Sequence, residues 1–464
     1  MKPHVTLVNP PYPSETYQHS PFPPLGLGYL AAVLEKNQYQ VDVIDCQASS
    51  LSYEDFKLKI GKRQPDIVGI TSTTRLYKSA LKIATIAKEV CPNCLTVIGG
   101  SHVTFWDENA LQECPQLDVV VRKEGEYTLL ELVQRLEAGK SIHDVLGTTL
   151  RKDDKIIKNP DRPYIENLDE LPFPAHHLFP LKNLQKYGTV VFPLSTSRGC
   201  TSWCNFCSAV RMFGRKYRMR TPKNVADELE FLNKKYNAQQ FTFYDDAFTV
   251  DQSRVQKICT EIQNRKLKIK WDCETRADMV TKDLLQNMTK AGCIAVWFGV
   301  EAGSQRVIDA MGKGLTIDKT KNAFKLARES GLMTVAGVIL GFPGETAETA
   351  WETIKFVEEI NPDDVGYYIA TPYPGTPMYD YVEKRGWLKI YDFDKYDTAT
   401  PTFESPTMSM KEIEKIRERA FQSFYLRPTY IFRMFRKGGS YGYAASRTAL
   451  AYLRRAIKSK LRIV

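Results

Sequence analysis

Runs of β-branched and apolar residues alternate with helical patterns twice along this chain, and this alternation constrains the fold more than any other feature. In the first half, strands are expected at 5–8, 41–45, 67–71, 95–98 and 119–121. Helical patterns near 26–36, 52–62, 77–90 and 126–137 separate them. Such alternation predicts a parallel sheet covered by helices on both faces. We therefore expect an α/β domain over residues 1–139.

A second alternation follows a proline-rich stretch at 140–190, which is expected to be a linker. From residue 191 onward, strands are expected at 190–195, 241–244, 268–273, 294–299, 333–340 and 364–369. These six strand–helix units predict a partial (β/α)6 TIM-type barrel over 191–380, with functional groups at the C-terminal ends of its strands. Residues 381–464 are expected to form a helical, basic and aromatic C-terminal region.

Three cysteines, Cys200, Cys204 and Cys207, follow the first strand of the expected barrel with the spacing C-x3-C-x2-C. Three thiolates this close can hold three irons of a [4Fe–4S] cluster and leave the fourth iron open. A structural zinc site is the alternative, but it usually needs four ligands. The next cysteine is Cys259, and no histidine follows His177. The triplet therefore favours an iron–sulfur cluster over zinc or unrelated core thiols.

The sequence resembles the radical S-adenosylmethionine (SAM) enzymes, whose signature is this cysteine spacing preceded here by Arg198-Gly199. The resemblance implies that the open iron holds SAM and that one electron then cleaves SAM to a 5′-deoxyadenosyl radical. The SAM contacts that it implies lie in the cysteine loop and at successive strand ends: Phe206, Asp245, Asp246, Arg276, Glu301 and Gly341.

Several of these residues also have ordinary structural interpretations. Asp245 and Asp246 would accept hydrogen bonds from the SAM ammonium group, or would cap the next helix. Arg276 would reach the SAM carboxylate or join a polar core network, and Glu301 would contact the ribose or a neighbouring arginine. A solvated face is expected for the basic run after the cysteines: Arg211, Arg215, Lys216, Arg218 and Arg220.

The first domain resembles the Rossmann-like (flavodoxin-like) cobalamin-binding domain that precedes many radical SAM enzymes. The matching pieces are Asn9-Pro10-Pro11, the stretch at 24–30, Gly99-Gly100-Ser101-His102 and Glu124-Gly125-Glu126. Ligands of such sheets bind beyond the carboxyl ends of the strands. The cobalamin contacts expected there are Asn9, Thr71, Ser72, Gly99, Gly100, His102 and Glu124.

One departure from the cobalamin pattern concerns the lower cobalt ligand. Classical cobalamin enzymes carry D-x-H-x-x-G, whereas this chain reads Asp45-Cys46-Gln47-Ala48-Ser49-Ser50. Gln47 stands where the histidine would be, so a histidine ligand below cobalt is not expected. A flavodoxin-like domain without a cofactor is the structural alternative.

Together the two resemblances imply an enzyme with a [4Fe–4S] cluster, SAM and cobalamin that modifies an unactivated carbon, because such cofactors carry chemistry that side chains cannot. The expected reaction is C-methylation of a lipid, isoprenoid or tetrapyrrole-like substrate, as in the cobalamin-dependent class B methylases. The alternatives are a radical oxidative cyclase, resembling the anaerobic magnesium-protoporphyrin monomethyl ester cyclases, and a non-catalytic cobalamin-binding module. A cellular one-electron donor is implied as a partner.

The composition of the C-terminal region indicates where in the cell the protein is found. From Arg419 onward the chain has eleven Lys or Arg and no Asp or Glu, interleaved with aromatic residues. This composition favours peripheral contact with an anionic membrane surface over solvated helices, and nucleic acid is not expected as a partner. No apolar run is long enough to span a membrane, and the first strand leaves no room for a signal peptide. We therefore expect a cytoplasmic protein with reduced cysteines, in contact with the membrane surface.

Overall fold

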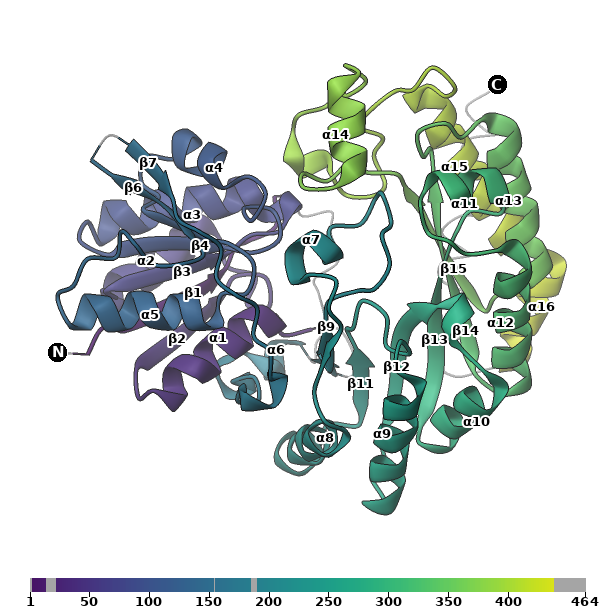
Figure 1. The fold of residues 1–464 in the computed structure, drawn as a ribbon, viewed down its shortest axis with the longest axis horizontal. Helices are drawn as coiled ribbons and strands as arrows, with labels where there is room; N and C mark the ends of the chain where they lie inside the picture. Colours follow the sequence, from purple (N-terminus) through teal and green to yellow (C-terminus); the bar gives the residue numbers. More distant parts are fainter. Residues whose placement is uncertain (1, 14–21, 154, 185–189, 438–464) are drawn as a thin grey trace.

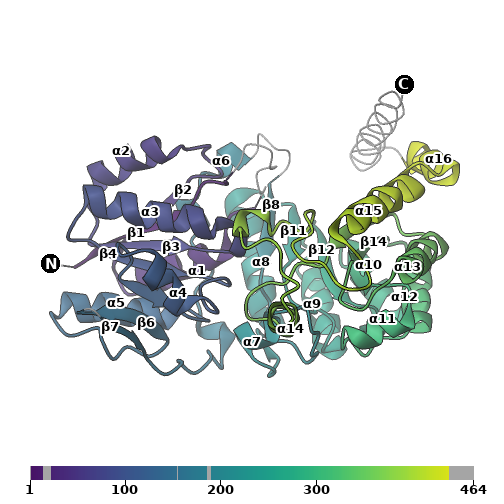
Figure 2. The same cartoon turned by 90° about the horizontal axis from the view of Figure 1, so that it is seen from above.

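The computed structural model describes residues 2–13, 22–153, 155–184 and 190–437, and two large β-sheets organise them. The N-terminal sheet lies at the left of Figure 1 and the C-terminal sheet at the right. Figure 2, seen from above, shows the two halves side by side.

The N-terminal half is a doubly wound α/β domain. Its strands are β1 (His4–Asn9), β2 (Gln40–Asp45), β3 (Ile67–Thr71), β4 (Leu95–Gly99), β5 (Val119–Val121), β6 (Thr148–Lys152) and β7 (Lys155–Lys158). Its helices are α1 (Leu25–Lys36), α2 (Tyr53–Arg63), α3 (Tyr77–Val90), α4 (Asp107–Glu113) and α5 (Glu126–Glu137). The sheet order is β2-β1-β3-β4-β5-β6-β7, with β1 to β5 parallel. Because successive strand residues face opposite sides, α1 and α5 share one core, and α2 and α3 share another.

The C-terminal half holds the second parallel sheet. Its strands are β8 (Val191–Leu194), β11 (Gln240–Phe243), β12 (Lys270–Arg276), β13 (Cys293–Glu301), β14 (Met333–Leu340) and β15 (Asp364–Ile369), and β9 (Ser197–Arg198) pairs separately with β10 (Arg218–Met219). The six large strands pair in sequence order, and among the described residues β8 and β15 do not pair with each other. The sheet is therefore an open, partial barrel, and the expected α/β fold class is confirmed for both halves.

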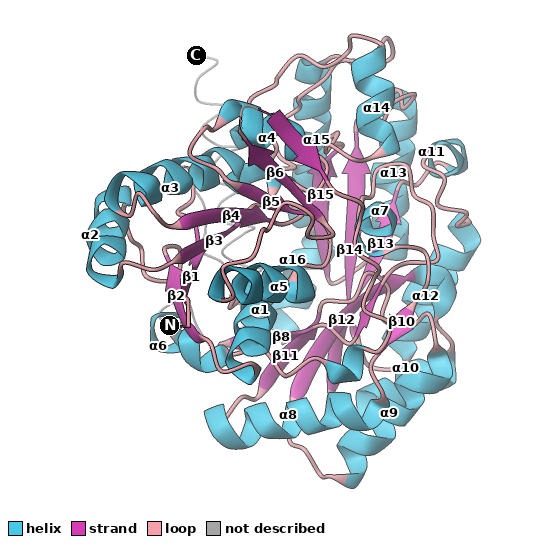
Figure 3. Cartoon of the chain, turned by 60° about the vertical axis from the view of Figure 1, so that its left-hand side comes forward, coloured by secondary structure: helices cyan, strands magenta, loops and turns pink. Residues whose placement is uncertain are grey.

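Helices cover the outside of this barrel, as the cyan helices around the magenta strands of Figure 3 show. The helices of the C-terminal half are α6 (Leu181–Leu184), α7 (Ala209–Phe213), α8 (Pro222–Tyr236), α9 (Gln252–Asn264), α10 (Lys282–Lys290), α11 (Gln305–Ala310), α12 (Ile317–Glu329), α13 (Ala347–Ile360), α14 (Pro377–Lys384), α15 (Met410–Tyr425) and α16 (Pro428–Lys437). Hydroxyl side chains begin several of them: Thr221, Thr281, Thr316 and Thr346 each accept a hydrogen bond from a first-turn backbone N–H.

The expected linker at 140–190 is partly wrong. Strands β6 and β7 lie inside it and extend the N-terminal sheet in antiparallel fashion. The buried Arg122 guanidinium, just after β5, holds the segment that follows β7 against the sheet, because it donates hydrogen bonds to the Asn159 carbonyl and the Asp161 carboxylate. The charged, proline-flanked sequence hid this hairpin from pattern analysis.

In the C-terminal region, α15 packs against β15 and α13, and α16 follows it. Residues 438–464, which hold much of the basic tail, lie outside the described residues. Among the helices that are described, none is both long and apolar enough to cross a membrane.

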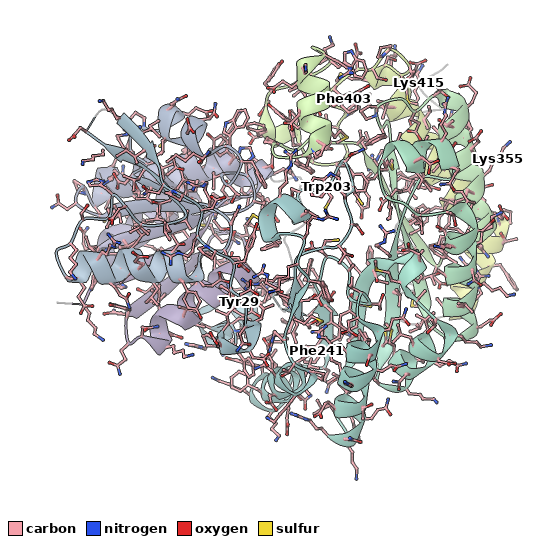
Figure 4. The ribbon with its side chains drawn as sticks, in the orientation of Figure 1. Tyr29, Trp203, Phe241, Lys355, Phe403 and Lys415 are labelled. Carbon is pink, nitrogen blue, oxygen red and sulfur yellow. The ribbon has the colours of Figure 1, made fainter. Side chains whose placement is uncertain are left out.

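Buried ion pairs join the two halves where the C-terminal ends of their strands face each other. Glu124, just after β5, accepts hydrogen bonds at 2.9 Å from both Arg198 and Arg218. Glu126 accepts one from Arg198 at 2.6 Å. These four side chains are only 2–10% exposed. The ring of Tyr29, labelled in Figure 4 on the side of α1 that faces the barrel, lies 5.3 Å from the Arg198 guanidinium.

The expectation of a solvated face is wrong for two of the arginines after the cysteines. Arg218 belongs to the ion pairs just described, and Arg220 is 4% exposed and pairs with Glu228 of α8 at 2.5 Å. Arg215 and Lys216 are exposed, as expected.

We predict that Glu124→Gln destabilises the protein by about 3–5 kcal/mol, because Arg218 and Arg198 keep their buried charges without a counter-ion. Urea-induced unfolding measures the effect. The matched control is Glu166→Gln, which removes only an exposed pair with Lys216 and should leave the midpoint nearly unchanged. Equal midpoints for the two variants would contradict a structural role for the buried pairs.

Candidate cofactor-binding and active site

The loop that carries the three cysteines is held in a fixed shape by its neighbours. Gly199 has φ +91°, and a side chain there would meet the Lys216 carbonyl oxygen at 2.4 Å, so only glycine fits before Cys200. Asn205, inside the triplet, donates its backbone N–H to Met311 and its side-chain amide to Ala310, both at 2.8 Å. Figure 4 shows Trp203 of this loop near α7, in the middle of the view.

All three cysteines line one cavity of about 450 Å³ at the C-terminal end of the barrel. No three or more His, Cys, Asp or Glu side chains among the described residues are placed to share a single metal ion. The structure therefore brings to one cavity the three thiols that the sequence analysis expected to hold a [4Fe–4S] cluster.

Four of the six expected SAM residues line this cavity: Phe206, Asp246, Arg276 and Glu301. Arg276 forms two 2.9 Å hydrogen bonds with Asp278 and donates to the Ser202 hydroxyl at 3.0 Å. Arg276 is therefore compatible with both interpretations, because it lines the cavity and also belongs to a polar network beside the cysteine loop.

Asp245 and Asp246 have separate surroundings although they are neighbours. Asp245 is 2% exposed and accepts hydrogen bonds from the backbone N–H groups of Thr196 and Ser197 at 2.6 and 3.1 Å. Asp246 instead faces the cavity, where burial and the Asp245 carboxylate raise its pKa to about 6. Neither residue caps a helix, because Asp251 is the cap of α9. Asp245 therefore positions the strand end, and Asp246 is available to a ligand.

Glu301 has a strained backbone and a fixed side chain. Its φ is +62°, in the left-handed region that residues other than glycine rarely adopt. Its carboxylate accepts a hydrogen bond from Lys313 at 2.5 Å, and Lys313 also donates to the Gly299 carbonyl at 2.6 Å. A side chain at Gly299 would meet both charged groups within 2.6 Å. The neighbouring cation that the sequence analysis expected beside Glu301 is thus a lysine rather than an arginine.

Gly341 does not line the cavity; it shapes the end of β14. Its φ is +80°, and its N–H donates to the Glu345 carboxylate at 2.5 Å. Burial raises the pKa of Glu345 to about 8. Thr346 caps the next helix, α13, so Glu345 lies in the turn before this helix and supports it.

A second cavity, of about 300 Å³, lies between the N-terminal sheet and the barrel. Four of the seven expected cobalamin residues line it: Thr71, Gly99, Gly100 and Glu124. The other walls are largely apolar and include Leu7, Val97 and Leu129. Its largely apolar walls suit the flat, apolar benzimidazole base at the end of the cobalamin nucleotide tail.

A third cavity, of about 410 Å³, adjoins the same strand ends. It is rich in hydroxyl groups, contributed by Thr73, Thr74, Ser101, Ser208 and Tyr373 among others. Hydroxyl groups are suitable partners for the amide side chains around a corrin. The second and third cavities together therefore fit cobalamin at the interface of the two halves.

Three of the expected cobalamin residues, Asn9, Ser72 and His102, line none of these cavities. Asn9 donates to Asp45 at 2.9 Å and accepts from Gln47 at 3.2 Å, and Gln47 also donates to the Pro10 carbonyl. The Gln47 side chain is therefore occupied in ordering this loop. Ser72 is buried, and its backbone N–H donates to Gly99.

His102 lines none of the three cavities described above, and it is not a surface residue. It is 1% exposed, with its ring 4.4 Å from that of Tyr77 and 4.5 Å from that of Phe393. Burial lowers the pKa of His102 to about 3, so the ring is neutral. Its neighbour Phe393 comes from the C-terminal region, which pattern analysis could not place beside it.

Sequence reasoning missed other residues that line the first cavity: Ser202, Glu274, Trp297, Lys313 and Tyr368. The position of Lys313 between two glycines was a usable signal. The alternation of β12 and β13 could have placed Glu274 and Trp297 inside the barrel, because residues two apart on a strand face the same side.

We predict that Asp245→Asn and Asp246→Asn act on different properties. Asp245→Asn should cost about 1–3 kcal/mol of stability, because an amide cannot accept all the hydrogen bonds of the carboxylate. Asp246→Asn should leave the unfolding midpoint almost unchanged but weaken SAM binding by roughly tenfold, the cost of one charge-assisted hydrogen bond. Urea unfolding measures the stability of each variant, and equilibrium dialysis with the cluster-reconstituted protein measures its affinity for SAM. An Asp246 variant as unstable as the Asp245 variant would contradict this division.

Comparison with known proteins agrees with this geometry. A model of the radical SAM superfamily matches residues 194–357, and a model of the B12 binding domain matches residues 19–133. An uncharacterized methyltransferase of Pyrococcus horikoshii, PH0819, is 37% identical over 411 residues, which is 89% of each chain. The anaerobic magnesium-protoporphyrin IX monomethyl ester cyclase of Rubrivivax gelatinosus is 33% identical, over 90% of this chain and 76% of its own.

Among solved structures, the cobalamin-dependent radical enzyme OxsB, with aqua-cobalamin and SAM bound, superposes with a TM-score of 0.77. It is 20% identical and covers 98% of this chain and 71% of its own, which shows a shared fold. With the cysteine cavity, the interface cavities and the two family matches in agreement, the chain belongs to the radical SAM enzymes with a B12-binding domain, whose cofactors are a [4Fe–4S] cluster, SAM and cobalamin.

Proposed function

We propose that this enzyme methylates an unactivated carbon of a small-molecule substrate bound between the two halves. One observation carries the proposal: Asp246 lines both the cysteine cavity and the apolar interface cavity. Asp246 is therefore shared by the cavity that we assign to SAM and the cavity that we assign to cobalamin in this proposal. A substrate beside Asp246 would be within reach of both cofactors.

When bound, the cluster and SAM supply a carbon radical and cobalamin supplies a methyl group. The residues of this chain bind and orient. Asp246 is placed to accept a hydrogen bond from the SAM ammonium group, Arg276 is placed to bind the carboxylate, and Glu301 is held by Lys313 at the same rim.

We include in the proposal the substrate class expected from the sequence, a lipid, isoprenoid or tetrapyrrole. Exposed aromatic side chains in the cavities support it, because they offer apolar surface to a ligand. The first relative described above is called a methyltransferase and the second a ring-closing enzyme. The reaction type is therefore what an experiment must decide first.

We predict that the protein, loaded with cluster and cobalamin and given reductant and SAM without substrate, releases S-adenosylhomocysteine in an amount equal to its bound cobalamin. A methylase must load a methyl group from one SAM before it can transfer it. Mass spectrometry measures S-adenosylhomocysteine and 5′-deoxyadenosine together. 5′-Deoxyadenosine without S-adenosylhomocysteine would replace the methylase proposal with oxidative cyclisation.

A triple variant separates the enzyme from a cobalamin-binding module. Replacing Cys200, Cys204 and Cys207 with alanine should remove the cluster absorbance and all 5′-deoxyadenosine while leaving cobalamin bound. Cobalamin binding with no 5′-deoxyadenosine from the wild-type protein would favour the module.

We also propose that a one-electron donor docks beside the cysteine loop. Trp203 is 50% exposed there, and the Arg215 guanidinium lies 5.4 Å from its ring. Exposed Arg215 and Lys216 favour a donor with an acidic surface. Added salt should therefore slow reduction of the cluster by an acidic donor protein but not by dithionite.

For location, we propose a cytoplasmic protein that contacts anionic membrane through residues 381–464. The excess of cations after Glu418 supports this, as does Phe432 on α16, which is 67% exposed.

We predict that the protein cosediments with vesicles containing phosphatidylglycerol but not with pure phosphatidylcholine. Changing Arg454, Arg455, Lys458 and Lys460 to glutamine should abolish this binding, since each cation near the surface contributes about 1 kcal/mol. The control removes four exposed cations of α2 and α3: Lys57, Lys59, Lys62 and Lys82. Equal losses in the two variants would show nonspecific attraction instead of a membrane-binding tail.

A further inference from the structure

Three aromatic side chains remain exposed although they line the cavities inside the molecule. Tyr244, Trp297 and Tyr368 are 51%, 37% and 40% exposed. Trp297 and Tyr368 line the cysteine cavity from β13 and β15, and Tyr244, just after β11, lines the apolar interface cavity. Large aromatic surfaces left open inside a cavity are typical of ligand-binding sites.

Glu274 is the charged residue among these rings. It pairs in register with Trp297 and lines the same cavity. Tyr368 lines this cavity too, and Tyr244 lines the interface cavity next to Asp246, the residue that lines both. Three side chains from β12, β13 and β15 therefore line one cavity, and Tyr244, just after β11, lines the adjoining one.

The carboxylate of Glu274 has no hydrogen bond or ion pair with any residue in the described part of the chain. Burial and the neighbouring carboxylates of Asp272, Asp246 and Glu301 raise its pKa. Two of these neighbours are occupied: Asp272 accepts a hydrogen bond from Thr242 at 2.6 Å, and Glu301 accepts one from Lys313. Glu274 therefore sits in a negative region without a cation of its own.

Depth in the barrel separates Glu274 from the expected SAM contacts. Glu274 precedes Arg276 by two residues on β12, so its Cα lies about 7 Å back along the strand, toward the bottom of the barrel, at about 3.3 Å per residue. Trp297 likewise precedes Gly299 and Glu301 on β13. Arg276 and Glu301 lie at the rim with the cysteines, whereas Glu274 and Trp297 form the floor below them.

We propose that Glu274, Tyr244, Trp297 and Tyr368 form the substrate-binding floor, and that the substrate has a flat, apolar body with an ammonium or N–H group that binds the Glu274 carboxylate. This inference rests on the proposed function, because it places the substrate in the same cavity system. Aromatic faces attract both flat apolar groups and cations, and a carboxylate in an apolar pocket accepts a strong hydrogen bond from N–H.

The test uses three probes with one ring system and different charge: 2-naphthylmethylamine, 2-naphthalenemethanol and 2-naphthoate. Dissociation constants are measured by equilibrium dialysis with protein that holds cluster and cobalamin and is saturated with SAM. We expect the amine to bind at least tenfold more tightly than the carboxylate probe, with the alcohol between them. Glu274→Gln should weaken the amine about tenfold and leave the alcohol unchanged.

Two further variants keep the test decisive. Trp297→Leu should weaken all three probes by a similar factor, up to about tenfold, because it removes a ring contact and no charge. Glu414→Gln, an exposed glutamate of α15, is the matched control and should change nothing.

Equal binding of the three probes, no binding of any probe, or an amine affinity unchanged in Glu274→Gln would overturn the proposal. So would displacement of SAM by the amine, which would assign Glu274 to SAM. The dialysis involves no turnover, so failure here is distinct from failure of the proposed methylation, which the release of S-adenosylhomocysteine reports.

Discussion

The buried contact between Glu124 and the two arginines Arg198 and Arg218 is the constraint on which the rest of this structure depends. Glu124 follows β5 of the N-terminal sheet, and Arg198 stands two residues before the first cysteine of the cluster loop. Moving the halves apart would leave a buried carboxylate on one half and buried guanidinium groups on the other without partners. Because unpaired buried charges are costly, the ion pairs hold the two halves in one relative position. That position makes the C-terminal edges of the two sheets face each other.

This arrangement explains why one cavity is lined by residues of both halves. Asp246 and Arg198 belong to the barrel, yet they line the apolar cavity together with Gly99 and Glu124 of the N-terminal sheet. The strained backbone of Glu301, whose side chain pairs with Lys313, lies at the rim of the cysteine cavity. Strained backbone is common at binding sites, where the surrounding contacts keep it in place. Glu124 and Arg198 therefore pair across the two halves and also line the cavity between them.

Most of the fold could be predicted from the sequence, because parallel strands buried on both faces leave continuous apolar runs between helical patterns. The strand at 67–71 and the helix at 126–137 were predicted with the bounds that the structure has. The hairpin of β6 and β7 was missed, because an edge hairpin with lysines lacks such runs. Roles at the site were harder: Asp245 and Asp246 differ only in side-chain direction, and His102 is buried by Phe393, which is distant in sequence.

We propose that both cofactors meet at Asp246. An anaerobic crystal structure of the protein with cluster, cobalamin and SAM bound tests this most directly. We expect the SAM ammonium group within hydrogen-bond distance of Asp246, and the corrin on the other side of the same residue. Cobalamin bound away from this interface, or SAM with its ammonium group directed away from Asp246, would show that the cofactors do not meet there.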